Sequence, residues 1–322
     1  MASNQSSLAL QGAEPGRVVV LYGGWSKERE VSLNGGAAVL RGLQESGVDA
    51  LGLDAGEDWM SQLQALQPDH VFIMLHGSGG EDGVVQGALE SMNLPYTGSG
   101  VLASALAMDK IRCKQFWLGI GLPTPRFEVL DASSNWCSVL DSLGGSAMVK
   151  PASEGSSLGM SKASTPAELE AAWQLARKYD ASVLAEQWLS GAEYTVAIVN
   201  GKALPTIKLE TDRAFYDYEA KYIADDTRFL CPCGLSVEQE SAMQAMAIKA
   251  YESLGCRGWG RVDLMLGGDG QCYVLEVNTV PGMTDHSLVP MAAIADGTSF
   301  NNLVLEILLA STSESSSMEA QS

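Results

Sequence analysis

The chain has 322 residues, 46% of them hydrophobic, and its 39 acidic residues outnumber its 20 basic ones. The formal charge of −19 argues against an extended nucleic-acid or anionic-membrane surface, so any phosphate site must be local. The length predicts two or three domains. The sequence has no apolar run of membrane-spanning length and no secretion-signal pattern, which predicts residence in the cytoplasm.

The first part of the chain, residues 17–105, predicts an open α/β domain with a parallel sheet. The apolar run at 17–22 ends at two glycines and is followed by leucines and alanines at helical spacing. A second buried strand, at 70–75, precedes the loop HGSGGEDG and another helix. Neither a G-x-G-x-x-G turn after the first strand nor a P-loop pattern is present, so dinucleotide and P-loop phosphate binding lose their main support. Residues 1–16 are expected to be disordered.

A central segment, residues 106–186, contains a strand that ends at Lys150 and runs into a serine- and glycine-rich loop at 151–160. Small residues and hydroxyl groups allow backbone amides to close around phosphate oxygens, and Lys150 would supply the charge. Such loops are also common solvated linkers, so both interpretations stand at this point.

The third part, residues 187–310, contains a predicted hairpin whose two strands flank the glycine-rich turn at 267–270. Alternation predicts a core face from each strand, made of Val262, Leu264 and Leu266 and of Tyr273, Leu275 and Val277. The opposite face carries Arg261, Asp263, Glu276 and Asn278. A pairing closed symmetrically on the turn would set Arg261 opposite Glu276, with Asp263 as the diagonal neighbour of Glu276.

Two carboxylates on one sheet face repel each other unless a proton or a cation lies between them. Together with the oxygen of Asn278, Asp263 and Glu276 form a set that suits Mg²⁺ better than zinc. A polar face that simply meets solvent is the competing interpretation. The rigid turn that follows, at 279–284, favours the metal site because its N–H groups can point at an anion.

The six cysteines are scattered, and only Cys231 and Cys233 are close together, without the second pair that a zinc site needs. We interpret them as reduced thiols, with a metal or redox role for this pair left open. The polar segment 311–322 predicts a disordered tail.

Eight blocks in order, spread over residues 17–310, resemble the D-alanine–D-alanine ligase family of the ATP-grasp superfamily. They are GGWSKEREVS, HGSGGEDG, YTGSG, MDK, KPASEGSSLGM, YDYEAKY, GRVD and EVNTVPGMTDHSLVP. The resemblance implies an α/β domain followed by a two-subdomain ATP-grasp fold. It also implies ATP-dependent joining of two D-alanine molecules through an acyl phosphate, for peptidoglycan synthesis, by what is commonly a homodimer.

The resemblance assigns the nucleotide and metal contacts by matched position. ATP phosphates would contact Lys110, Lys150 and Lys221, whereas adenine and ribose would contact Glu186, Gln187, Trp188, Leu189 and Glu193. Two Mg²⁺ ions, or Mn²⁺, would be held by Asp263, Glu276 and Asn278. Gln187 and Val280 depart from residues that are frequent in the family, which affects the adenine contacts and the anion turn.

The remaining matched positions concern the amino-acid substrates. Glu28 would face the ammonium group of the first D-alanine and form a hydrogen-bonded triad with Ser156 and Tyr222, and His76 would lie beside that substrate. Arg261 and the Gly282 amide would stabilise the oxyanion, and Ser287 and Leu288 would contact the second carboxylate. Residues 225–227 resemble a mobile loop over the site.

The sequence leaves two alternatives open: a D-alanine–D-lactate ligase, or another ATP-grasp carboxylate–amine ligase. The tyrosine at position 222 favours an amine nucleophile, because depsipeptide-forming relatives depart from the EAKY pattern.

Overall fold

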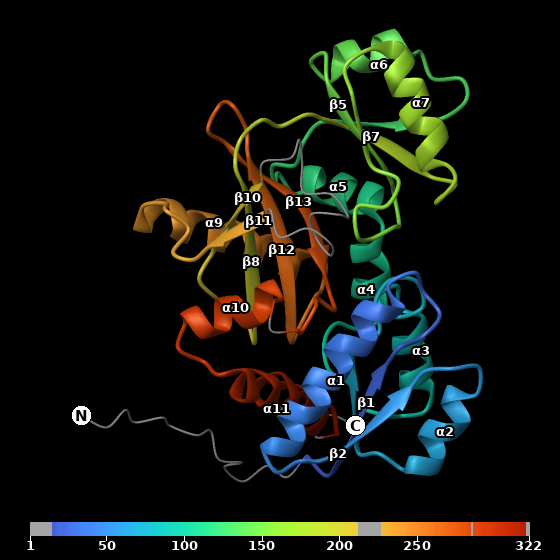
Figure 1. Ribbon diagram of the computed structural model, residues 1–322, viewed down its shortest axis with the longest axis vertical. Helices are drawn as coiled ribbons and strands as arrows, with labels where there is room; N and C mark the ends of the chain where they lie inside the picture. The colour runs from blue at the N-terminus through green and yellow to red at the C-terminus, as the bar shows by residue number, and fades with distance from the viewer. Residues whose placement is uncertain (1–14, 212–226, 285, 320–322) are drawn as a thin grey trace.

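The computed structural model describes residues 15–211, 227–284 and 286–319, with side chains only as far as residue 311. Within these ranges the chain forms three sheets with helices around them (Figure 1). None of the helices in the described part of the chain is long and apolar enough to cross a membrane.

The N-terminal sheet is parallel, as the sequence predicts, with strand order β2-β1-β3. Its strands are β1 (Arg17–Tyr22), β2 (Asp49–Asp54) and β3 (His70–Ile73). Residues 18–21 of β1 are completely buried, because helices cover both faces of the sheet. The helices of this region are α1 (Arg29–Glu45), α2 (Trp59–Leu66), α3 (Val84–Ser91) and α4 (Val101–Met108).

The central region contains an antiparallel sheet of order β4-β7-β5-β6, at the top of Figure 1. Thr165 caps helix α7 (Pro166–Ala176) through its side chain, and Pro166 occupies the first turn, where a backbone N–H would have no partner within the helix. The strands are β4 (Phe127–Leu130), β5 (Ala147–Pro151), β6 (Ser161–Ala163) and β7 (Val183–Gln187). The helices are α5 (Lys110–Gly119), α6 (Trp136–Ser142) and α7 (Pro166–Ala176).

The third sheet has the order β11-β10-β8-β12-β13, with β9 paired to β8. Its strands are β8 (Glu193–Val199), β9 (Lys202–Ala203), β10 (Ile207–Thr211), β11 (Thr227–Leu230), β12 (Trp259–Leu266) and β13 (Cys272–Asn278). Helix α9 (Val237–Ser253), which begins with a capping box between Ser236 and Gln239, packs against β12 and β13. Two further helices, α10 (Leu288–Ala295) and α11 (Phe300–Glu319), complete the chain.

The register of the β12–β13 hairpin differs from the symmetric pairing that the sequence predicts. Asp263 lies directly opposite Glu276, and Arg261 lies opposite Asn278. Two extra residues on the β13 side cause the shift. Leu266 pairs with Cys272, so the turn has five residues, and a bulge after Asp263 leaves Leu275 without a paired residue.

Because of the same bulge, the predicted core face of β13 is wrong. Tyr273 and Leu275 were expected in the core together with Val277, but the buried pair is Val274 and Val277. Leu275 instead lines a cavity, and the Tyr273 hydroxyl donates to Asp269. One inserted residue is enough for this exchange, because side chains alternate between faces along a strand.

The end of the chain packs back onto the first sheet. Residues Leu303, Val304, Ile307 and Leu308 of α11 belong to the same buried cluster as β1, β2 and β3. Helix α11 continues to Glu319, whereas the composition predicts a disordered tail from Ser311. A helix already nucleated by buried residues gains one hydrogen bond for each residue that it adds, which favours this extension.

Candidate active site

Two adjoining cavities lie where the three sheets meet. The first, of about 830 Å³, is lined by side chains of the N-terminal domain and of the loop after β13. The second, of about 600 Å³, lies between the central and C-terminal sheets. Gly155, Ser156 and Glu276 line both cavities, so a group bound in one can reach a group bound in the other.

The polar face of the hairpin forms a connected network at this junction. The Asp263 carboxylate accepts hydrogen bonds from Arg261 Nε at 2.8 Å and Nη2 at 2.7 Å. It also accepts from the Thr195 hydroxyl at 2.7 Å and from Asn278 Nδ2 at 3.1 Å. The structure therefore places all four predicted polar residues of the hairpin on one face. The longer turn and the bulge together bring the two carboxylates directly opposite each other.

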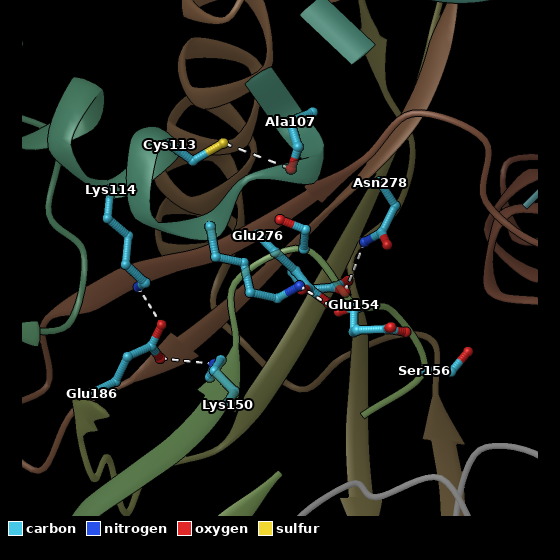
Figure 2. A network of polar contacts seen from close by, with 12 residues as sticks. Ala107, Cys113, Lys114, Lys150, Glu154, Ser156, Glu186, Glu276 and Asn278 are labelled. Atoms are coloured by element: carbon cyan, nitrogen blue, oxygen red, sulfur yellow. Dashed lines mark hydrogen bonds and ion pairs between the residues drawn. The ribbon is translucent and has the colours of Figure 1, made fainter. Parts of the chain in front are cut away.

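Three lysines line or underlie the second cavity, and Figure 2 shows two of them, Lys114 and Lys150, on either side of Glu186. Lys110, at the start of α5, donates to the Glu154 carbonyl at 2.8 Å and lies 3.3 Å from Glu276 Oε2. Lys150 forms an ion pair with Glu186 at 2.8 Å. Lys114 lies behind Glu186 at 2.9 Å and was not singled out from the sequence, because its spacing on α5 is that of an ordinary helix residue.

The serine- and glycine-rich loop connects the central sheet to the N-terminal domain. The Ser156 hydroxyl donates to Glu28, and Lys27 forms an ion pair with Glu154 at 2.7 Å. A Cβ atom on Gly155 would lie 3.0 Å from the Glu28 carboxylate, so a glycine permits this close approach. Glu28 and Ser156, which are 128 residues apart, meet as the resemblance implies.

His76 and Glu81 form the wall of the first cavity beside Arg261. Burial lowers the pKa of His76 to about 4, so its imidazole is neutral at pH 7. Among the described residues, His76 Nε2 has no hydrogen-bond partner.

Glu81, which the sequence analysis did not select, accepts from the Gly77 amide at 2.7 Å and from the Val280 amide at 3.3 Å. Burial, together with the nearby Glu28 carboxylate, raises the pKa of Glu81 to about 8. In the sequence, membership of the HGSGGEDG block is the feature from which a role for Glu81 in the site could have been predicted.

The loop after β13 makes the tight turn that the sequence predicts. Ser287, which precedes α10, accepts from the Thr284 amide at 2.9 Å. A Cβ atom on Gly282 would lie 2.9 Å from the Ser287 hydroxyl, so glycine permits this close approach. Gly282, Ser287 and Leu288 all line the first cavity.

The hinge after β7 borders the second cavity with Gln187, Trp188, Leu189 and Glu193. The Gln187 and Trp188 amides donate to the carbonyls of Arg126 and Ser146, so β7 remains bonded on both sides. Arg126 Nε also donates to the Gln187 side chain at 3.0 Å. Lys162 lies over the Trp188 ring, 4.1 Å from its centroid.

Three expectations fall partly or wholly beyond the described residues. Lys221 and Tyr222 lie outside them, as do residues 225 and 226 of the loop expected to cover the site.

All six cysteines are free thiols, and a cis peptide bond links Cys231 to Pro232. Within the described ranges, no three His, Cys, Asp or Glu side chains gather to hold a metal.

Two antiparallel sheets facing each other across a lysine-lined cavity define the class of protein, an ATP-grasp ligase. The model of the D-ala D-ala ligase C-terminus matches residues 116–309, and that of the N-terminus matches residues 55–99. The chain belongs to the D-alanine–D-alanine ligase family.

Relatives of similar length agree with this assignment. A D-alanine–D-alanine ligase of Saccharophagus degradans is 58% identical over 91% of this chain and 93% of its own length. Another, of Stutzerimonas stutzeri, is 57% identical over 92% of this chain and 94% of its own.

Solved structures agree as well. A D-alanine–D-alanine ligase structure from Bacillus anthracis superposes with a TM-score of 0.83 at 35% identity, covering 92% of this chain and 97% of its own. A structure of a D-alanine–D-alanine ligase from Bacillus anthracis complexed with ATP has a TM-score of 0.81 at 32% identity, covering 92% of this chain and 97% of its own.

Proposed function

We propose that this chain uses ATP to join two D-alanine molecules into D-alanyl-D-alanine for peptidoglycan. One observation carries the proposal: the lysine-lined cavity and the cavity bordered by Glu28, Arg261 and Gly282 meet at Glu276. A γ-phosphate in the lysine-lined second cavity can thereby lie next to a substrate carboxylate in the first cavity. Phosphoryl transfer depends mainly on such positioning and on charge neutralisation.

In the proposed nucleotide site, Lys110 and Lys150 contact the phosphates, and Lys221 joins them by resemblance. Glu186, Gln187, Trp188 and Leu189 surround adenine, and Glu193 binds the ribose hydroxyls. The support is that all the described members of this set line one cavity between the two sheets. Its volume of about 600 Å³ is in the range of small-molecule sites.

Asp263, Glu276 and Asn278 offer oxygen ligands of the kind that Mg²⁺ and Mn²⁺ prefer. The donor set fits, because two carboxylates and an amide oxygen leave positions that phosphate oxygens and water can complete. Bound there, two ions would neutralise charge on the phosphates as the γ-phosphoryl group moves.

In the proposed reaction a carboxylate oxygen of the first D-alanine attacks the γ-phosphorus, and ADP leaves. The amine of the second D-alanine, once it has lost a proton, then attacks the acyl carbon. A C–N bond forms, the bond from carbon to the phosphate oxygen breaks, and phosphate departs. Arg261 and the Gly282 amide stabilise the oxyanion between these events.

Glu28 binds the ammonium group of the first D-alanine, and Ser156 holds Glu28 in place. Tyr222 completes this triad by resemblance. His76, neutral and with Nε2 facing no described partner, lies beside the same substrate. Ser287 and Leu288 bind the carboxylate of the second D-alanine from the start of α10.

The test is phosphate release and dipeptide formation by the purified chain with ATP and MgCl₂. D-alanine should support both, whereas L-alanine should support neither. D-lactate offered with D-alanine distinguishes the depsipeptide alternative, since that product would replace the dipeptide. ATP hydrolysis that does not depend on D-alanine would refute the proposal.

The family resemblance also supports a homodimer that works in the cytoplasm. Sedimentation equilibrium would show a mass of twice 34.1 kDa for a dimer. A species of single-chain mass across micromolar concentrations would contradict this part of the proposal.

A further inference from the structure

A charged side chain that is completely buried lies directly behind the nucleotide site. Lys114 of α5 has no solvent exposure, a rare position for lysine unless its charge is paired. Its Nζ lies 2.9 Å from Glu186 Oε1 and donates to the Thr124 hydroxyl at 2.7 Å. The Thr124 hydroxyl donates in turn to the Val274 carbonyl at 2.9 Å, which joins Lys114 to strand β13.

Glu186 therefore lies between two ammonium groups, Lys114 on Oε1 and Lys150 on Oε2 (Figure 2). Burial disfavours the charge on Glu186, but the two lysines outweigh it and lower the pKa of this carboxyl group. Two positive charges against one negative leave this cluster with a net charge of +1. Without Lys114, the pair of Lys150 and Glu186 would be neutral.

The difference matters because Lys150 lines the cavity, whereas Lys114 does not. A lysine whose charge is cancelled by its own carboxylate partner attracts phosphate weakly. A second lysine behind that carboxylate restores the attraction while contributing no atom to the cavity wall.

We propose that Lys114 is a positioning residue that neutralises Glu186 from behind, so that the ammonium group of Lys150 remains available to the nucleotide phosphates. This inference rests on the proposed function, in which Lys150 contacts phosphate. It adds a residue that acts only through Glu186 and touches no substrate.

The test compares Lys114→Met, Glu186→Gln and the double variant by calorimetric titration with ADP in MgCl₂. Methionine approximates the volume of lysine, so the change is mainly in charge. Lys114→Met should weaken ADP binding about tenfold, or about 1.4 kcal/mol. In the Glu186→Gln background, which already includes the loss of any contact between Glu186 and adenine, Lys114→Met should change ADP affinity less than about threefold, because Lys150 then has no carboxylate that cancels its charge.

Thr124→Val is the matched control, because it removes the hydroxyl but keeps both charges, and it should change ADP affinity less than about threefold. Thermal melting reports on folding for each variant. A purely structural role for Lys114 predicts a lower melting temperature and the same loss of ADP affinity from Lys114→Met whether residue 186 is glutamate or glutamine. That result, or unchanged ADP affinity in Lys114→Met, would overturn this inference alone. A wild-type chain that bound no ADP would overturn the proposed function as well.

Discussion

Asp263→Asn is the substitution for which the structure predicts the largest combined loss of stability and activity. Asp263 Oδ2 accepts from Arg261 Nη2 at 2.7 Å and from Asn278 Nδ2 at 3.1 Å. In asparagine, an NH₂ group in that position faces two donors. The Asp263 and Arg261 side chains are only 11% and 16% exposed, so water replaces these bonds poorly.

The magnitude follows from these two contacts. A hydrogen bond to a charged group contributes about 1.5–3 kcal/mol, and removal of one partner of a buried pair costs about 3–5 kcal/mol. Because Oδ1 can still accept from Thr195, we expect the free energy of unfolding to fall by about 3 kcal/mol. Loss of a proposed metal ligand should also lower kcat about a hundredfold or more, as when one group that stabilises charge in a transition state is removed.

The two effects are measured separately, by urea unfolding of the nucleotide-free chain and by phosphate release at saturating MgCl₂. Asp269→Asn, at the exposed tip of the same hairpin, removes one negative charge outside the site and should cost less than about 1 kcal/mol. Should Asp263→Asn match this control in both assays, the reasoning from the Asp263 network would be wrong.

Three further substitutions test other parts of the site. Glu276→Gln should reduce turnover at least a hundredfold by removing a proposed metal ligand and the carboxylate partner of a lysine, and wild-type turnover at saturating MgCl₂ would exclude that role. Ser156→Ala removes the hydroxyl that holds Glu28 and should raise the KM for D-alanine about tenfold; an equal rise in Ser153→Ala, an exposed serine of the same loop, would contradict this. His76 has a pKa of about 4 when folded against 6.5 when unfolded, so its contribution to stability is present above pH 6.5 and is lost, by about 3 kcal/mol, as the pH falls to 4. His76→Asn should flatten that part of the curve of unfolding free energy against pH, and an unchanged slope would show that the histidine does not titrate in this way.

The contact between Glu81 and Val280 joins two loops that line the first cavity. Glu81 belongs to the loop that carries His76, and Val280 begins the turn that carries Gly282. A carboxyl group bonded to the Gly77 and Val280 amides holds one loop against the other.

Much of the fold, and the family, could be predicted from the residues alone. Continuous apolar runs predicted a parallel first sheet, and alternating runs around glycines predicted the hairpin with Asp263, Glu276 and Asn278 on one face. These features depend on local patterns of side-chain spacing, which a single sequence displays directly. Blocks of matched residues then indicated the family.

The register of that hairpin and the surroundings of each charge depend instead on contacts between distant parts of the chain, which the structure reveals. The bulge at Leu275 is a single residue whose placement depends on the partner strand and on packing beneath it, so local pattern leaves it undetermined. The sequence around Lys114 predicts only an ordinary helix residue, because its burial against Glu186 depends on the packing of the helix. Glu81 contacts Val280, which is 199 residues away in the sequence. Residue spacing along the chain does not predict a contact between positions so far apart.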